Sequence, residues 1–130
     1  METQFTRQRG RFAILTHDHP FFHWDLLLEA GDTAWTWRLR ERRETRVEGR
    51  EPAIPPSDLS TLFIERIADH RRLYLDYEGP VSGNRGHVAR VDWGEYSITA
   101  ECEAEFHVWL VGQQDSRTII LPRESAERPG

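Results

Sequence analysis

The sequence predicts a mainly β protein, built as a small antiparallel β-barrel with short flanking helices or loops. Short apolar runs alternate with turn signals, several of these runs alternate apolar and polar residues, and five tryptophans provide bulky filling for a small core. The 130 residues are the length of a single domain, 1–130, with polar termini at about 1–10 and 124–130.

The N-terminal part of the chain predicts a three-stranded meander. Arg11–Thr16 is β-like, and Phe21–Glu29 is a second strand that ends at the turn signal Ala30-Gly31-Asp32. Ala34–Arg40 then alternates apolar and polar residues, as a half-buried strand does. The stretch 40–56 is charged and then rich in proline, so we expect a surface loop there.

The second half of the chain begins with an ambiguous segment and continues as strands. Ser57 or Asp58 can cap a short helix over Leu59–Ile67, but the same segment also suits a strand. A glycine-rich turn is expected at 82–86. Four further strands are expected at His87–Trp93, Tyr96–Glu101, Phe106–Val111 and Thr118–Leu121.

The composition narrows the possible chemistry. All 17 basic residues are arginine, so reactions that need a lysine amine are excluded. The net charge of −5 argues against a broad, nonspecific nucleic-acid binder, although guanidinium groups suit bidentate phosphate recognition. Cys102 is the single cysteine, which excludes a disulfide framework; we expect it to be buried in a cytoplasmic protein. No signal peptide or membrane span is predicted, and no membrane partner is expected.

Four potential metal ligands lie within nine residues: His17, His19, His23 and Asp25. His23 and Asp25 are two residues apart, so a strand would point both side chains the same way. His17 would come from the end of the preceding strand. Two imidazoles and a carboxylate suit Mn²⁺ or Zn²⁺ and leave positions open for water and substrate. Alternatively, Asp18 and His19 make turn hydrogen bonds and His23 lies at a strand edge.

Two sequence blocks resemble the 3′-phosphoesterase module of bacterial DNA ligase D. The segment HDHPFFHWDLLLE at 17–29 is similar to the family pattern H-x5-H-[YW]-D-[FL]-x-L-E. The segment DHRRLYLDYEG at 69–79 is similar to D-H-x3-Y-x-D-[FY]-E-G, and the likeness extends over about 12–96. It implies a Mn²⁺-dependent enzyme of non-homologous end joining that processes 3′-ribonucleotides or 3′-phosphates at DNA or RNA–DNA ends. Its partners would be end-joining ligase or polymerase proteins acting in trans.

The resemblance also implies a role for each matched residue. His17, His23 and Asp25 correspond to the metal ligands. His70 corresponds to the histidine that contacts the scissile phosphate, and Tyr74 to a nearby phenol that supports the site. This set is chemically coherent, because a metal neutralises phosphoryl charge while a histidine transfers a proton.

The chain departs from the family pattern at two arginine positions, which are occupied here by Leu27 and Leu62. Losing guanidiniums weakens transition-state binding unless other groups replace them. We expect Arg85, in the glycine-rich turn, and Arg71 to bind phosphate. His19 is expected to support the metal ligands from outside the coordination sphere.

Other arginines and other functions also fit the sequence. Arg38 and Arg40 follow the metal strand and are further candidates for phosphate contacts, although Arg40 and Arg72 are expected to be solvated surface residues. Without the two family arginines, the protein would act as an inactive module that binds DNA ends or a repair partner. A metal-dependent hydrolase of small phosphate esters is the third possibility.

Overall fold

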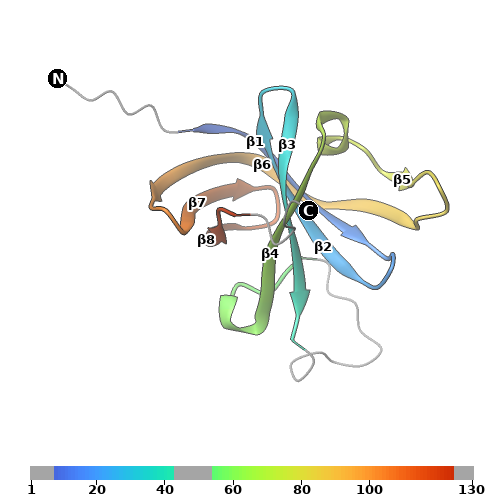
Figure 1. Cartoon of the computed structure of the whole chain (residues 1–130), viewed down its shortest axis with the longest axis horizontal. Helices are drawn as coiled ribbons and strands as arrows, with labels where there is room; N and C mark the ends of the chain where they lie inside the picture. The colour runs from blue at the N-terminus through green and yellow to red at the C-terminus, as the bar shows by residue number, and fades with distance from the viewer. Residues whose placement is uncertain (1–7, 43–53, 125–130) are drawn as a thin grey trace.

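The computed structural model describes residues 8–42 and 54–124, so most of each predicted polar end and most of the predicted 40–56 loop lie outside the described residues, while β1 begins at Arg9. The fold is mainly β, an antiparallel half-barrel, which confirms the predicted fold class (Figure 1). The sheet has the strand order β4-β3-β2-β1-β6-β7-β8, with β5 paired to β6. The strands are β1 (Arg9–His17), β2 (His23–Ala30), β3 (Thr33–Glu41), β4 (Leu62–Arg71), β5 (Gly79–Pro80), β6 (His87–Glu101), β7 (Glu105–Gly112) and β8 (Ser116–Pro122).

The segment after the predicted loop is a strand and not the short helix. Asp58 caps only a single 3-10 turn, η2 (Leu59–Thr61), by accepting a hydrogen bond from the backbone N–H of Ser60. β4 then runs antiparallel to β3, which gives its backbone groups partners along the sheet. A second 3-10 turn, η3 (Arg72–Leu75), follows β4. None of the helical turns in the described segments is long enough to cross a membrane.

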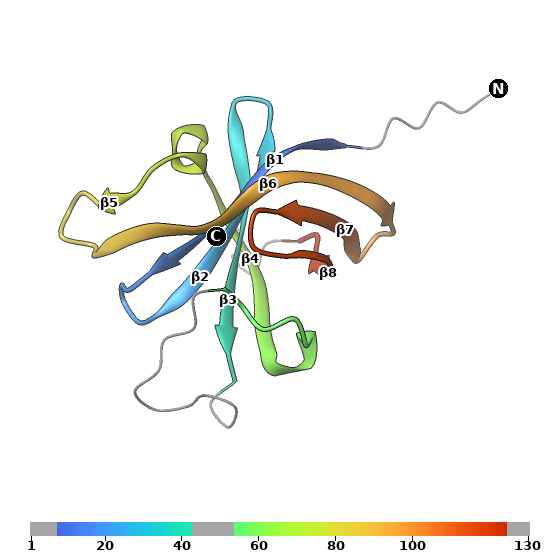
Figure 2. The ribbon, with the colours of Figure 1, turned by 180° about the vertical axis from the view of Figure 1, so that it is seen from behind.

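β6 joins two strands that the sequence predicts as separate. The predicted break at Gly94 and Glu95 lies inside one 15-residue strand. This position requires a glycine, because the backbone of Val111 passes so close that a side chain at position 94 would clash with it. The long strand crosses the whole molecule, with β5 at one end and β7 at the other (Figures 1 and 2).

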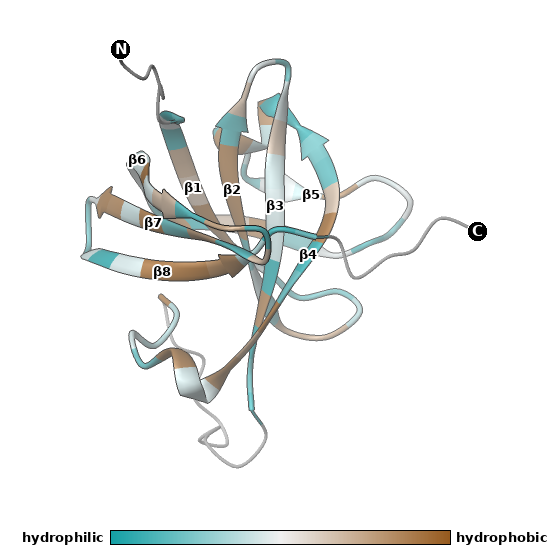
Figure 3. Cartoon of the chain, turned by 60° about the vertical axis from the view of Figure 1, so that its left-hand side comes forward, coloured by the Kyte–Doolittle hydropathy of each residue, from teal (hydrophilic) through white to brown (hydrophobic). Residues whose placement is uncertain are grey.

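The two faces of the sheet carry different cores, because side chains alternate along each strand. Figure 3 shows the hydrophobic residues of the strands in brown, for example along β8. The face that bears Phe12 and Trp24 is called the inner face here, and the face that bears Leu15 and Leu27 is called the outer face. The main cluster on the inner face consists of Phe12, Ile14, Trp24, Leu26, Leu28, Trp37, Leu39, Leu62, Tyr96, Ile98, Phe106, Val108, Leu110, Ile119 and Leu121. The smaller cluster on the outer face consists of Ala13, Leu15, Leu27, Ala34, Leu75 and Val88.

Side chains of β3 and β4 bond to the end of β8 and so connect the two ends of the strand order. Trp37 Nε1, on β3, donates a hydrogen bond to the carbonyl of Pro122 at 2.7 Å, and Arg66 Nη1, on β4, donates to the carbonyl of Arg123, just past β8, at 2.7 Å. These contacts hold the half-barrel around its main core. Cys102 lies exposed after β6, so the prediction that it is buried is wrong: the strand ends one residue earlier and the thiol lies in the following turn.

Candidate metal centre

The hairpin of β1 and β2 brings the three predicted ligands together on the outer face. His17 and His23 are direct cross-strand partners at the loop end of this hairpin, where the chain connects β1 to β2. Asp25 lies two residues beyond His23 and therefore points to the same face. Leu15, two residues before His17, pairs with Asp25 and belongs to the outer cluster, so the ligands lie beside a packed layer.

The ligand atoms are spaced as the donors of one metal ion would be. His17 Nδ1 lies 3.4 Å from Asp25 Oδ2, and His23 Nε2 lies 3.2 Å from Asp25 Oδ1. One ligand atom from each of the three residues lies within 4.8 Å of the others. Donors that share an ion at about 2.1 Å are about 3.0–3.4 Å apart for neighbouring positions. The group can therefore hold a divalent cation.

Each histidine offers a lone pair to the centre because its other nitrogen is hydrogen-bonded to a carbonyl. His23 Nδ1 lies 2.9 Å from the carbonyl of Phe21, and His17 Nε2 lies 2.9 Å from the carbonyl of Arg85. A carbonyl only accepts, so these nitrogens carry the protons and the neutral rings present bare nitrogens to Asp25. Such orienting bonds are typical of metal-ligating histidines.

The centre contains buried acceptors that no donor in the described part of the chain satisfies. His23 Nε2 and Asp25 Oδ1 have no hydrogen-bond partner there, and the two side chains are 0% and 3% exposed. Buried polar atoms without partners are costly, and two acceptors that face each other repel. A cation between them would satisfy both atoms, so the donor set fits a metal.

The ionisation of the centre favours a charged carboxylate. Burial opposes ionisation of Asp25, but the hydrogen bonds that the His17 and His23 rings donate to it when they are protonated outweigh burial and hold the pKa of this carboxyl below its usual range. The hydrogen bond that the protonated His17 ring donates to Asp25 raises the pKa of His17 above its ordinary value. A proton on His17 therefore competes with a metal ion for the same nitrogen.

A β-bulge in β4 turns His70 towards the site. Ala34 pairs with His70 and Thr36 pairs with Ile67, so two steps along β3 oppose three steps along β4. The extra residue shifts the side-chain alternation by one. His70 therefore shares the outer face with Ile67, whereas regular alternation would direct it to the inner face.

His70 lies close enough to the centre to act on a molecule bound there. Its Nε2 is 3.9 Å from Asp25 Oδ2, and its Nδ1 is 3.2 Å from the carbonyl of Ala68. The Nδ1 proton is therefore donated to Ala68, and Nε2 faces the centre without one in the neutral ring. Tyr74 packs edge-on against His70, with ring centroids 5.8 Å apart.

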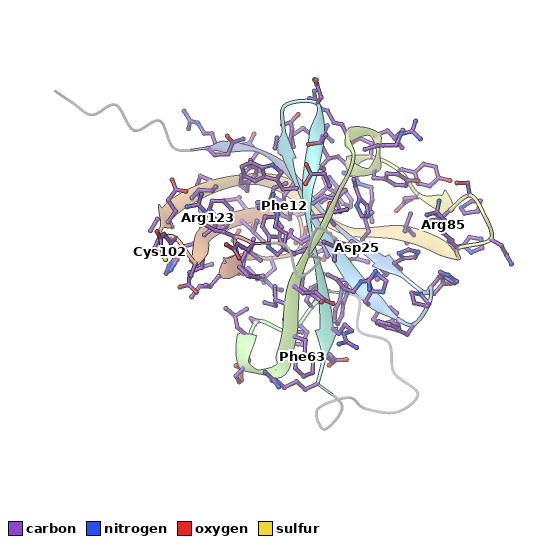
Figure 4. All side chains as sticks on the ribbon, viewed as in Figure 1. Phe12, Asp25, Phe63, Arg85, Cys102 and Arg123 are labelled. Carbon is purple, nitrogen blue, oxygen red and sulfur yellow. The ribbon has the colours of Figure 1, made fainter. Side chains whose placement is uncertain are left out.

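A cavity of about 570 Å³ opens beside the ligands and contains both predicted phosphate-binding arginines, Arg71 and Arg85. Arg71 is exposed and makes no ion pair with any described residue. Arg85 Nε donates to the carbonyl of Ser82 at 2.7 Å, so its guanidinium closes the glycine-rich turn while its own carbonyl orients His17. Figure 4 shows Arg85 on the loop beside Asp25.

His19 lines the cavity but is exposed and makes no hydrogen bond to the three ligands within the described ranges. Its neighbour Asp18 makes the turn contact instead, because Asp18 Oδ1 accepts the backbone N–H of His87 at 2.8 Å. This bond ties the β1–β2 loop to the end of the glycine-rich turn. Asp18 therefore helps to fix the loop that separates the two histidine ligands.

The two leucines at the family arginine positions are both buried. Leu27 is 0% exposed in the outer cluster, and Leu62 is 4% exposed in the main cluster. Leu62 and His70 are eight residues apart on β4, which corresponds to about 26 Å along a strand. An arginine at either position would have to displace core packing.

Arg38 is the arginine that lies nearest to the ligands along the strands. It pairs directly with Asp25 across β2 and β3 and lines the cavity, and its buried Nε has no hydrogen-bond partner among the described residues. The sequence contains a signal for this placement: a two-residue turn at Gly31-Asp32 fixes the register that pairs these residues. A scan against protein-family models and a search of curated proteins each find no match to this chain.

Proposed function

We propose that this protein is a cytoplasmic, metal-dependent phosphoesterase that processes 3′-phosphate or 3′-ribonucleotide ends of nucleic acids. The observation that carries the proposal is the convergence of His17, His23 and Asp25 near His70, beside a cavity that arginines also line. The two motifs that resemble the ligase D phosphoesterase supply the substrate class. In end joining, the protein would act in trans with a ligase or polymerase.

The metal proposed for this centre is Mn²⁺, and Zn²⁺ also suits its two nitrogens and one carboxylate. His17 Nδ1, His23 Nε2 and Asp25 would hold it. When bound, the ion would supply positive charge that neutralises a phosphoryl group. The carbonyls of Phe21 and Arg85 would keep both imidazoles in the required tautomer and orientation.

His70 would carry the proton transfers. In hydrolysis of a 3′-phosphate, a water oxygen bonds to phosphorus while the bond between phosphorus and the 3′ oxygen breaks. His70 Nε2 accepts a proton from the attacking water, and the resulting imidazolium returns one to the leaving 3′ oxygen. The bond from Nδ1 to the carbonyl of Ala68 stabilises this charged form, and Tyr74 holds the ring in place.

Arg38 would bind the non-bridging phosphate oxygens. Its position opposite Asp25 places a guanidinium on the same face as the metal ligands. A guanidinium recognises phosphate through paired N–H donors and stays charged at every working pH. Arg71, which is exposed at the rim of the same cavity, would add a second positive charge.

The test is incubation of a primer-template that ends in a 3′-phosphate or a 3′-ribonucleotide with the protein and Mn²⁺. We expect end trimming by the wild type, loss of trimming on chelation, and a fall of at least about 100-fold for His23→Ala or His70→Ala. His107→Ala is the matched control, because His107 is a histidine on β7 that pairs with Glu105.

The outcomes separate this proposal from its alternatives. Binding of 3′-phosphate ends without turnover would identify a binding module. Hydrolysis of small phosphomonoesters with no action on nucleic acid would identify a hydrolase of small esters. Absence of any metal-dependent trimming by the wild type would contradict the proposed activity.

A further inference from the structure

A row of arginines leads from the metal centre along the outer face of the sheet. Arg38 and Arg40 are two residues apart on β3, so their side chains lie on the same face of the sheet. Arg42 continues the row just past the end of the strand. Arg40 pairs with Phe63 on β4, which places Phe63 on the same face. Phe21 joins the row from the β1–β2 loop. We call these five residues the arginine–phenylalanine ladder.

The members of the ladder alternate in space through cation–π contacts. The Phe21 ring lies 5.7 Å from the guanidinium carbon of Arg38 and 5.2 Å from that of Arg40. The Phe63 ring lies 5.5 Å from that of Arg40 and 4.3 Å from that of Arg42. Stacking on a ring fixes the plane of a guanidinium while its N–H edge can still bind an anion.

One end of the ladder touches the metal centre. The rings of Phe21 and His23 meet edge-on with centroids 5.6 Å apart, and Arg38 is the cross-strand partner of Asp25. The four-residue step from Arg38 to Arg42 extends about 13 Å along the strand. Figure 4 shows the other end, where Phe63 lies near the start of β4, well away from Asp25 in that view.

The ladder combines exposed aromatic rings with guanidinium groups. Phe21 is 41% exposed and Phe63 is 46% exposed, so both rings present apolar surface to solvent. Within the described residues, the Nε atoms of Arg38 and Arg40 are buried and have no hydrogen-bond partner. Exposed rings beside guanidinium groups form a surface that is suited to a ligand with flat rings and repeated anions.

We propose that the ladder is a track for single-stranded nucleic acid. Bases stack on aromatic side chains whatever their sequence, and arginines follow the backbone phosphates. A duplex needs a broad basic surface, which a chain of net charge −5 does not offer, whereas a strand needs only a narrow row. The further claim that the track delivers a 3′ end to His70 rests on the proposed function.

An acidic protein segment is the competing occupant, and the rings argue against it. Carboxylates would pair with the arginines, but they would leave the exposed faces of Phe21 and Phe63 without a flat partner. The phosphates of a nucleic-acid strand are spaced by bases, which provide the stacking partners.

The test is fluorescence anisotropy of the full chain with labelled oligothymidylate, in EDTA so that metal chemistry plays no part. We expect Phe63→Ala to weaken binding about tenfold through the loss of one stacking contact. Arg40→Ala should weaken binding and lower the slope of log affinity against log salt by about 0.7. Trp109→Ala and Arg9→Ala are the matched controls, because Trp109 is also 41% exposed but lies on β7, and Arg9 is exposed at the far end of β1 from His17.

Equal thermal melting of all four variants confirms that each one is folded. Unchanged oligonucleotide affinity in Phe63→Ala and Arg40→Ala would overturn the track, as would equal losses in the two controls. Stronger binding of a poly-glutamate peptide than of the oligonucleotide would assign the surface to a protein partner and also overturn it. Binding is measured without metal, so a failure of end trimming would contradict the proposed enzyme and leave the proposed track unaffected. End trimming together with unchanged binding in the ladder variants would contradict the track and leave the proposed enzyme unaffected.

Discussion

At the scale of single residues, the chemistry of the metal centre follows from the second nitrogen of each histidine. The carbonyls of Phe21 and Arg85 take the ring protons of His23 and His17, so the opposite nitrogens face Asp25 as acceptors. The same logic applies to His70, whose ring proton goes to Ala68. Backbone carbonyls in the loops thus define which atoms can bind a metal or move a proton.

Tyr96 gives a pH-dependent prediction that is independent of the metal. Its hydroxyl donates to the carbonyl of Glu29 at 2.7 Å, and burial raises its pKa above the ordinary value. The folded state therefore favours the neutral phenol. This stabilisation is fully present below the pKa of about 10 that a tyrosine has in the unfolded chain. It is lost as the pH rises through the higher pKa that Tyr96 has in the folded protein.

We expect Tyr96→Phe to lower the free energy of unfolding by about 1 kcal/mol at pH 8, because two partly buried hydrogen bonds are lost: the hydroxyl donates to the carbonyl of Glu29 and accepts from Gln8 Nε2. The difference from wild type should shrink above about pH 10. Urea unfolding of both proteins at pH 8 and above about pH 10 measures this difference in the free energy of unfolding. The chain has no lysine, so no lysine amine titrates in the same pH range. A difference that grows with pH would contradict the assignment.

Single residues were predicted from the sequence where strand alternation alone decides their direction. His23 and Asp25 share a face for that reason, and the structure brings His17 to them. Arg38 was only one of several candidates, because its place opposite Asp25 depends on the register between two strands. The prediction for Cys102 failed because burial in a turn depends on tertiary packing and not on residue type.

At the scale of elements, irregularities in the strands position the site. The bulge in β4 directs His70 outward, and no local pattern in the sequence marks it. The helix-or-strand ambiguity over Leu59–Ile67 had the same origin, because pairing with β3 outweighs helical spacing. Likewise, the sequence predicts a break at Gly94, but β6 continues through it. The reason for the glycine is the close approach of the β7 backbone, which the sequence does not show.

Leu27→Arg tests whether the family arginine could occupy its position in this chain. The side chain is fully buried against Leu15 and Leu75, so a guanidinium there would lack partners. We expect the free energy of unfolding to fall by about 3 kcal/mol or more in chemical denaturation. Leu27→Met, which conserves volume, should cost less than about 1.5 kcal/mol. Wild-type stability with increased end trimming would show that the site tolerates the family residue.

Asp92 stabilises the turn between β7 and β8 and was not singled out by its sequence. Its Oδ1 accepts three backbone N–H groups, from Trp93 at 3.0 Å, Gln113 at 2.7 Å and Gln114 at 2.9 Å. Asp92→Ala leaves these donors unsatisfied and should cost about 2–4 kcal/mol in urea unfolding. Asp92→Asn keeps an acceptor oxygen and should lose less. Equal stability of the alanine variant and wild type would show that the carboxylate does not hold the turn.

At the scale of the whole molecule, one sheet serves two purposes through its two faces. The inner face holds the main cluster, which is closed at the seam where Trp37 and Arg66 bond to the end of β8. The outer face holds the smaller cluster, the metal centre and the ladder. A rigid core behind the site keeps the ligands in register, while the outer face remains accessible to substrate.

The mainly β fold was predicted because strand periodicity and turn residues are local signals. It was harder to predict that both faces of the sheet carry buried clusters. The alternation of side chains shows which residues share a face, but it does not show which loop covers that face. Val81 and Tyr77 pack against the outer cluster from the segment after η3, a contact between regions far apart in sequence. The cavity beside the ligands exists because that segment covers only part of the outer face.

The most direct test of the account is calorimetric titration of the metal-free protein with Mn²⁺. We predict one ion bound per chain by the wild type and by His107→Ala, and a loss of affinity of at least about 100-fold in His23→Ala and Asp25→Asn. Circular dichroism spectra identical to wild type would show that both variants are folded. Equal Mn²⁺ binding by wild type and Asp25→Asn, or no binding by the folded wild type, would contradict the metal centre and the function built on it.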